Sequence, residues 1–289
     1  MAAMFDRLAE DIMRSGFEVH AAEILSDGLT VFHHAFGEDR RYPVYSVTKC
    51  VTSAAFSTAC DEGKVAPDTP LADFLERRYR AEMPEGFADM PFSRFLSMTA
   101  GEYPFRPEGD DWVSFALSSV KNIRAGAFCY SNIPAYLVGA ALENAVGEGL
   151  AGYIQKRLFD PLEIPQPPYR TCPHGHFYGA TGMELTVHEL AKLGELYLRR
   201  GKWNGRQLIS ENAVSDALSV HSQTGAPGVG CGYIFRIYAD HFDMSGKWGQ
   251  RCVVYPEKKL VLAWLANEPG RSEELINFFC RAAKEQNVF

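Results

Sequence analysis

The chain has 289 residues, of which 46% are hydrophobic and 22% are charged, as in an ordinary soluble globular protein with a large core. A formal net charge of −7, without runs of Lys or Arg, argues against nucleic acid or an anionic membrane as a partner. Seven cysteines without C-x-x-C pairing are typical of a reduced compartment, and residues 1–17 predict an amphipathic helix rather than a secretory signal. No apolar run is long enough to span a membrane. We therefore expect a cytoplasmic protein.

Helical and strand-like patterns alternate along the chain in a definite order. Residues 18–36 predict a β-hairpin around a turn at Asp27-Gly28, and Val47–Cys60 predicts an apolar helix that ends before Gly63. Further helices are predicted at residues 68–75, 92–98, 112–120, 132–146, 150–158, 185–200, 210–219 and 272–284. Strands are predicted at residues 233–238, 251–255 and 260–266, with a turn at 256–259.

This order predicts an α+β fold in which both chain ends contribute to one sheet. Residues 1–45 and 220–289 would form the α/β sheet domain, and residues 46–219 would form a mainly helical domain inserted between them. We expect the active site in the cleft between the two domains.

The first candidate for chemistry is the Ser-x-x-Lys pattern of Ser46 and Lys49, at the start of a predicted helix. Residues three apart share a helix face, so the lysine amine would lie near the serine hydroxyl. A lysine whose pKa is lowered by burial can take the serine proton, and helix N-terminal amides stabilise developing negative charge. The pattern also arises by chance, and the chain contains a second copy at Ser118 and Lys121.

Two further segments carry polar groups suited to catalysis. In Tyr130-Ser131-Asn132, the phenol could relay a proton and the amide could bind a carbonyl, although Asn132 also suits a helix N-cap. In the segment Ser245-Gly246-Lys247, the glycine would allow the backbone to approach a ligand closely. The alternative for this segment is an ordinary hairpin turn.

Taken together and in this order, the three segments resemble the signature elements of the penicillin-binding-protein and serine β-lactamase superfamily. The class C β-lactamase and esterase branch is the most similar. The resemblance extends over most of residues 42–266 and includes the following segments: 95–101, 124–132, 158–162, 179–183, 201–206 and 253–267.

This resemblance implies a mainly antiparallel sheet flanked by the terminal helices beside an inserted helical domain. It implies that Ser46 forms an acyl-enzyme while Lys49 and Tyr130 transfer protons. The backbone N–H groups of Ser46 and Lys247 would form the oxyanion hole, and Asn132, Ser245, Gly246 and Lys247 would contact the substrate. No cofactor and no metal is implied.

One departure from the family pattern concerns the substrate. In lactamases and peptidases the third element begins with Lys or His, which binds the substrate carboxylate, whereas Met244 takes that place here. A thioether cannot pair with a carboxylate, and the nearest basic residue is Lys247. Small-molecule carboxylesters or amides are therefore better expected substrates than β-lactams. The rival hypothesis is a non-catalytic protein that binds a ligand or peptide on the same fold.

A metal site is weakly suggested by Cys172, His174 and His176. Their spacing matches no common zinc pattern and no fourth ligand is evident. We therefore interpret this segment as a polar loop.

Overall fold

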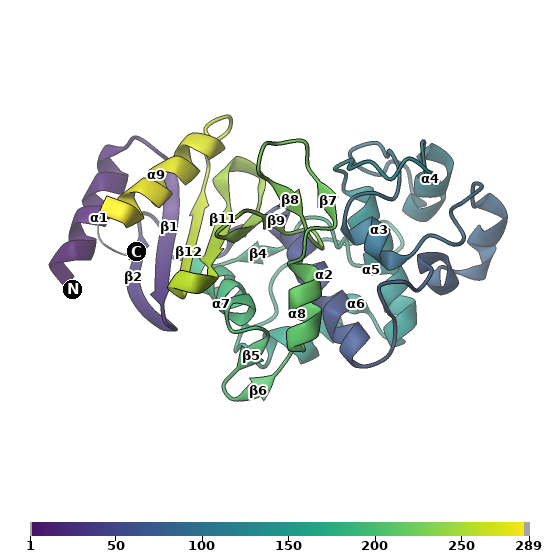
Figure 1. The fold of residues 1–289 in the computed structure, drawn as a ribbon, viewed down its shortest axis with the longest axis horizontal. Coiled ribbons are helices and arrows are strands. Elements are labelled where there is room, and N and C mark those ends of the chain that lie inside the picture. Colours follow the sequence, from purple (N-terminus) through teal and green to yellow (C-terminus); the bar gives the residue numbers. More distant parts are fainter. Residues whose placement is uncertain (1, 286–289) are drawn as a thin grey trace.

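The computed structural model describes residues 2–285, and one eight-stranded sheet organises them (Figure 1). Neighbouring strands in it run antiparallel, in the order β2-β1-β12-β11-β10-β9-β8-β7. The strands are β1 (Val19–Ser26), β2 (Leu29–Ala35), β7 (Ser222–Gln223), β8 (Gly230–Cys231), β9 (Arg236–Ile237), β10 (Phe242–Ser245), β11 (Arg251–Tyr255) and β12 (Leu260–Ala266). The prediction of a mainly antiparallel α+β fold is confirmed.

Strands from both ends of the chain pair in this sheet, next to its β2 edge. The β1–β2 hairpin turns at Asp27 and Gly28, which adopt φ values of 47° and 81°, and such values favour Asp and Gly. Strand β1 then pairs with β12 from the far end of the chain, with Ala22 opposite Trp264. The apolar residues of both strands direct this pairing, because β12 is buried along its whole length and β1 is buried except at His20 and Ser26.

Helices cover the two faces of the sheet. The terminal helices α1 (Ala2–Arg14) and α9 (Ser272–Glu285) lie against the face that carries Trp264, whose ring stacks on Phe279 at 4.3 Å (Figure 1). Helix α7 (Val187–Leu198) packs against β1, β11 and β12. This helix comes from the segment assigned to the helical part, so the sheet recruits it from the middle of the chain. The two-domain division and its cleft remain predictions.

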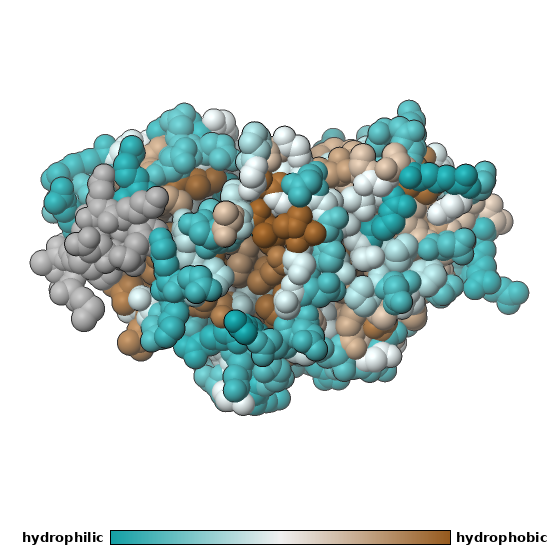
Figure 2. All heavy atoms as spheres, viewed as in Figure 1, coloured by the Kyte–Doolittle hydropathy of each residue, from teal (hydrophilic) through white to brown (hydrophobic). Residues whose placement is uncertain are grey.

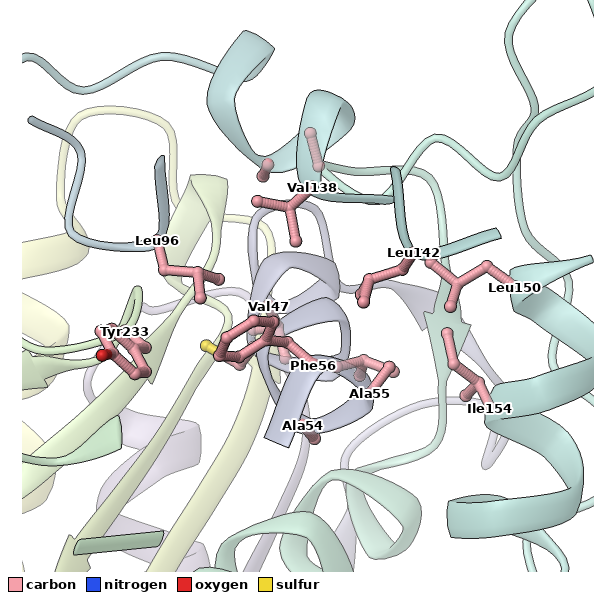
Figure 3. Packing of buried hydrophobic residues seen from close by; sticks show 14 of the residues in the cluster. Val47, Ala54, Ala55, Phe56, Leu96, Val138, Leu142, Leu150, Ile154 and Tyr233 are labelled. Atoms are coloured by element: carbon pink, nitrogen blue, oxygen red, sulfur yellow. The ribbon is translucent and has the colours of Figure 1, made fainter. Parts of the chain in front are cut away.

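Helix α2 (Val47–Asp61) forms the centre of the helical region, with nearly all of its residues buried (Figure 3). Four helices surround α2 or its neighbours: α3 (Phe92–Leu96), α5 (Ile133–Val146), α6 (Leu150–Ile154) and α8 (Glu211–Ala217). The remaining elements are α4 (Trp112–Ser119), the short helices η1 (Leu71–Phe74), η2 (Arg77–Glu82), η4 (Lys247–Gly249) and η5 (Pro256–Lys258), and the two-stranded pairs β3 (Tyr42–Pro43) with β4 (Glu184–Leu185) and β5 (Lys202–Trp203) with β6 (Arg206–Gln207). Figure 2 shows a mostly hydrophilic face with an apolar patch near its middle, where Figure 1 places β8 and β9.

Several predicted elements differ in extent from those in the structure. The helix predicted at 68–75 is only the 3-10 turn η1, and the helix predicted at 150–158 continues beyond Ile154 as the π-helical turn η3 (Gln155–Phe159). Helix α7 starts at Val187 because Leu185 belongs to β4 and Thr186 caps the helix. The strand predicted at 233–238 shrinks to β9, since Ile234 has a φ of 77°.

Strand β10 was not predicted, because a charged residue interrupts its apolar pattern. Asp243 is 2% exposed and forms an ion pair with Arg251 on β11 at 2.6 Å. The pair makes burial of the carboxylate tolerable, since an unpaired buried charge costs several kcal/mol. Met244 and Ser245 are the last two residues of β10. The third signature segment therefore consists of the end of β10 followed by the short helix η4.

Candidate active site

Ser46 lies at the N-cap position of α2, where a strained backbone turns into the helix. Tyr45 directly before it has a φ of 48°, which is uncommon for a residue with a β-carbon. The Ser46 hydroxyl makes no capping hydrogen bond to the helix, although serine is a favoured cap. The hydroxyl instead lies 3.0 Å from Lys49 Nζ, one turn further along α2.

Lys49 is fully buried, and three oxygen atoms surround its amine. Besides Ser46 Oγ, these are Asn132 Oδ1 at 2.7 Å and the carbonyl oxygen of Ala180 at 2.9 Å. Burial lowers the pKa of Lys49 from 10.5 to about 7. A neutral amine has two N–H donors and one lone pair. In the neutral form, with Asn132 and Ala180 accepting the two donors, the lone pair would be left for the Ser46 hydroxyl.

Tyr130 and Asn132 both reach this amine from the start of α5. The Tyr130 ring centroid lies 5.0 Å from Lys49 Nζ, and 43% of the residue is exposed. Burial around its hydroxyl raises the pKa of Tyr130, and a hydrogen bond with Ser46 counteracts that rise. Asn132 occupies the N-cap position of α5, yet its side chain does not cap the helix. The N-cap position predicted from the sequence is confirmed, but the amide bonds to Lys49 instead of capping the helix.

The third segment lies against the residues that lead into Ser46. A β-carbon on Gly246 would lie 2.3 Å from the Val44 carbonyl oxygen, so only glycine allows these backbones to touch. The Trp248 ring contacts the Tyr45 ring edge-on at 5.2 Å between centroids. The backbone N–H groups of Ser46 and Lys247 donate to no acceptor among the described residues. Both are therefore available to a ligand.

The other residues of the third segment point to different surroundings. The Lys247 ammonium lies 4.2 Å from the Trp248 ring centroid and forms no ion pair among residues 2–285. Met244 is 1% exposed and belongs to the main apolar core, which explains why a thioether suits this position. Within the described chain, the Ser245 hydroxyl bonds to no protein group, so the structure does not connect it to Ser46.

Sequence reasoning missed two groups that complete the surroundings of Lys49. These are the Ala180 carbonyl and the Tyr178 hydroxyl, which accepts a hydrogen bond from Asn132 Nδ2 at 3.2 Å. Gly179 lets this segment pass between α2 and α5, since a β-carbon there would lie 2.8 Å from Thr52 Oγ1. The paired glycines around Ala180 were a usable signal of close backbone approach.

The segment weighed as a metal site has other partners. His176 Nδ1 contacts the Glu143 carboxylate, and this hydrogen bond raises the pKa of His176. Cys172 is buried. Within the described residues, no group of three or more His, Cys, Asp or Glu side chains is arranged to bind a metal.

A comparison with family models decides the family. The model of the beta-lactamase family matches residues 5–279. The chain belongs to the beta-lactamase family. Members of this family are in general serine hydrolases, and the arrangement of Ser46 and Lys49 accords with that chemistry. No curated protein matches the chain.

Solved structures share the fold of this family member. A penicillin-binding protein homologue from Caulobacter crescentus superposes with a TM-score of 0.76 at 18% identity, covering 97% of each chain. A beta-lactamase from Mycobacterium bovis gives 0.68 at 20% identity, covering 93% of this chain and 98% of the other. EstCE1, a hydrolase with promiscuous acyltransferase activity, gives 0.74 at 15% identity, covering 94% of each. At these identities the likeness establishes the fold alone.

Helix length and hydropathy give one result about membranes. Of the helices in residues 2–285, none combines the length and the apolar character needed to cross a bilayer.

Proposed function

We propose that this beta-lactamase family member is a hydrolase that forms an acyl-enzyme on Ser46. One observation carries the proposal: the buried Lys49 amine, with a pKa lowered to about 7, lies 3.0 Å from Ser46 Oγ. A general base is most effective when its pKa is close to the working pH. An ordinary surface lysine would be protonated and could not accept the serine proton.

The proposed reaction proceeds in two halves. Neutral Lys49 takes the Ser46 proton as Oγ attacks the substrate carbonyl, and the N–H groups of Ser46 and Lys247 stabilise the oxyanion. The proton then passes through the Tyr130 hydroxyl to the leaving alcohol or amine, and the bond to the leaving group breaks. Water attacks the acyl-enzyme in the second half, which releases the acid and returns the proton to Ser46.

We infer that carboxylesters or small amides are better substrates than β-lactams. A penicillin carries a carboxylate, which must be paired or solvated when it is bound. Met244 offers no charge, and its burial in the core supports this inference. The fold likeness to EstCE1, described as a hydrolase with acyltransferase activity, agrees with an acyl-transferring site.

Covalent labelling tests the proposal. A serine-directed fluorophosphonate should add one adduct to the wild-type protein by intact-mass measurement, and Ser46→Ala should abolish both the adduct and ester hydrolysis. Ser118→Ala is the matched control, because Ser118 belongs to the second Ser-x-x-Lys copy and its hydroxyl bonds to the Ser114 carbonyl. Absence of an adduct on the wild type would favour the non-catalytic binding protein. An adduct that persists in Ser46→Ala would refute the choice of nucleophile.

A further inference from the structure

We propose that Tyr178 is a positioning residue for Lys49, acting through the side-chain amide of Asn132. The inference rests on the proposed function and adds a residue to its machinery. Tyr178 lies in the loop before β4, far in sequence from the three signature segments, and its hydroxyl bonds to Asn132.

The side-chain amide of Asn132 lies between the Lys49 amine and the Tyr178 hydroxyl, and each of these groups bonds to a different end of the amide. Its Nδ2 donates to the Tyr178 hydroxyl at 3.2 Å, and its Oδ1 accepts from Lys49 Nζ at 2.7 Å. An amide has a donor end and an acceptor end of nearly equal size, so sterics alone would allow both orientations. The phenol oxygen supports the observed orientation by accepting the N–H, and the Lys49 amine supports it at the other end by donating to Oδ1.

The orientation decides what the Lys49 lone pair can do. With Oδ1 facing the amine, the amine donates to it and keeps the lone pair for the Ser46 proton. With Nδ2 facing the amine, the amide would donate to that lone pair and would leave the Ser46 proton without an acceptor. The reversed amide would also disfavour the ammonium form of Lys49, because the N–H groups of Asn132 Nδ2 would face the N–H groups of the ammonium.

The position of the Tyr178 hydroxyl is fixed because aromatic contacts hold its ring. The Trp112 ring on α4 contacts the Tyr178 ring edge-on, with 4.7 Å between ring centroids. The Tyr136 ring on α5 also lies edge-on to it, with 6.1 Å between centroids. Tyr178 is 7% exposed, and its backbone N–H donates to the Arg170 carbonyl at 2.9 Å. Tyr178 therefore holds its hydroxyl in place without help from Asn132.

The local structure of α5 supports a functional use of this amide. As an N-cap, Asn132 would ordinarily accept a hydrogen bond from the first turn of its own helix. Here the Ser131 hydroxyl accepts the Ile133 N–H at 3.1 Å, and the Asn132 amide is left to connect Lys49 with Tyr178.

Tyr178→Phe tests the proposal, because it removes one hydroxyl and keeps the ring. We expect kcat for a neutral ester to fall about 10-fold while KM changes little, as for loss of one oriented hydrogen bond. The acid limb of the pH–rate profile should move to lower pH, since the reversed amide disfavours the ammonium. Tyr136→Phe is the matched control, because its ring belongs to the same cluster, whereas among the described residues Asn132 Nδ2 donates to Tyr178 and not to Tyr136. The Tyr136→Phe control should leave both kcat and the acid limb of the pH–rate profile unchanged.

A merely structural role predicts a different result. Loosened packing would admit water to Lys49 and would move the acid limb to higher pH. That shift, or equal losses in Tyr178→Phe and Tyr136→Phe, would overturn the proposal.

A double-mutant cycle with Asn132→Ala gives a second, independent test. If Tyr178 acts through Asn132, then Tyr178→Phe should have no further effect on kcat in the Asn132→Ala background. Independent, multiplicative losses would contradict the proposal. Labelling of wild-type Ser46 distinguishes the two failures: an unlabelled wild type removes the proposed function and this inference with it, whereas a labelled wild type with an unaffected Tyr178→Phe removes this inference alone.

Discussion

Gly246 lies so close to Val44 that a β-carbon on the glycine would be 2.3 Å from the Val44 carbonyl oxygen. This contact joins the end of β10 to the segment that leads into Ser46. Because Lys247 directly follows Gly246, we propose that this contact holds the Lys247 N–H near Ser46.

Gly246→Ala should therefore impair catalysis for a steric reason. The φ of Gly246 is −124°, which alanine adopts freely, so backbone strain is not the cause. Separating the two backbones would displace an oxyanion donor, and we expect ester hydrolysis to fall about 100-fold. Gly37→Ala is the control, because no atom lies within 4 Å of a β-carbon there. Equal rates for both variants would show that the Gly246–Val44 contact does not position the site.

The pH dependence of hydrolysis should report Lys49. The amine must be neutral to accept a proton, so the rate should rise as the pH passes about 7, the lowered pKa of Lys49. Lys49→Arg should lose at least about 100-fold in kcat, since guanidinium stays protonated. Lys121→Arg, at the second Ser-x-x-Lys copy, should retain wild-type rates. Substantial activity in Lys49→Arg would exclude the role of general base.

The buried lysine should also make stability depend on pH. Its pKa is about 7 in the folded protein and 10.5 in the unfolded chain, so between these values the unfolded chain binds more protons. The free energy of unfolding should then rise with pH, by up to about 1.4 kcal/mol per unit from this group. Denaturant titrations of wild type and Lys49→Met from pH 7 to 10 would measure the difference. The contribution of Lys49 to the slope should be lost in Lys49→Met, so its slope should be less positive than those of the wild type and Lys121→Met. Identical slopes in all three proteins would contradict this prediction.

Substrate choice should change with a cation at residue 244. We expect the wild type to hydrolyse a neutral short-chain ester far faster than a penicillin. Met244→Lys should raise the ratio of penicillin to ester acylation and should lower the melting temperature, because it buries a charge in the core. Met244→Leu, which keeps the packing without charge, should leave the ratio unchanged. Efficient wild-type penicillin turnover that is lost in Lys247→Ala would show that Lys247 supplies the cation.

Local features of this protein could be predicted from the sequence alone. The Asp27-Gly28 turn, the apolar strands β11 and β12, and helix α2 ending before Gly63 all follow from short-range backbone preferences and periodicity. The closeness of Ser46 to Lys49 is of the same kind, because one helical turn joins them.

Only the tertiary structure decided which distant groups surround the Lys49 amine. Asn132 is 83 residues from Lys49 and Ala180 is 131 residues away. No local sequence pattern predicts their hydrogen bonds with the Lys49 amine. The same holds for strand β10, where the buried Asp243 carboxylate forms an ion pair with Arg251 of the neighbouring strand. Backbone preference acts over a few residues, whereas these contacts depend on how α2, α5 and the loop at Tyr178 pack around a shared core. Burial in that core is also what lowers the pKa of Lys49.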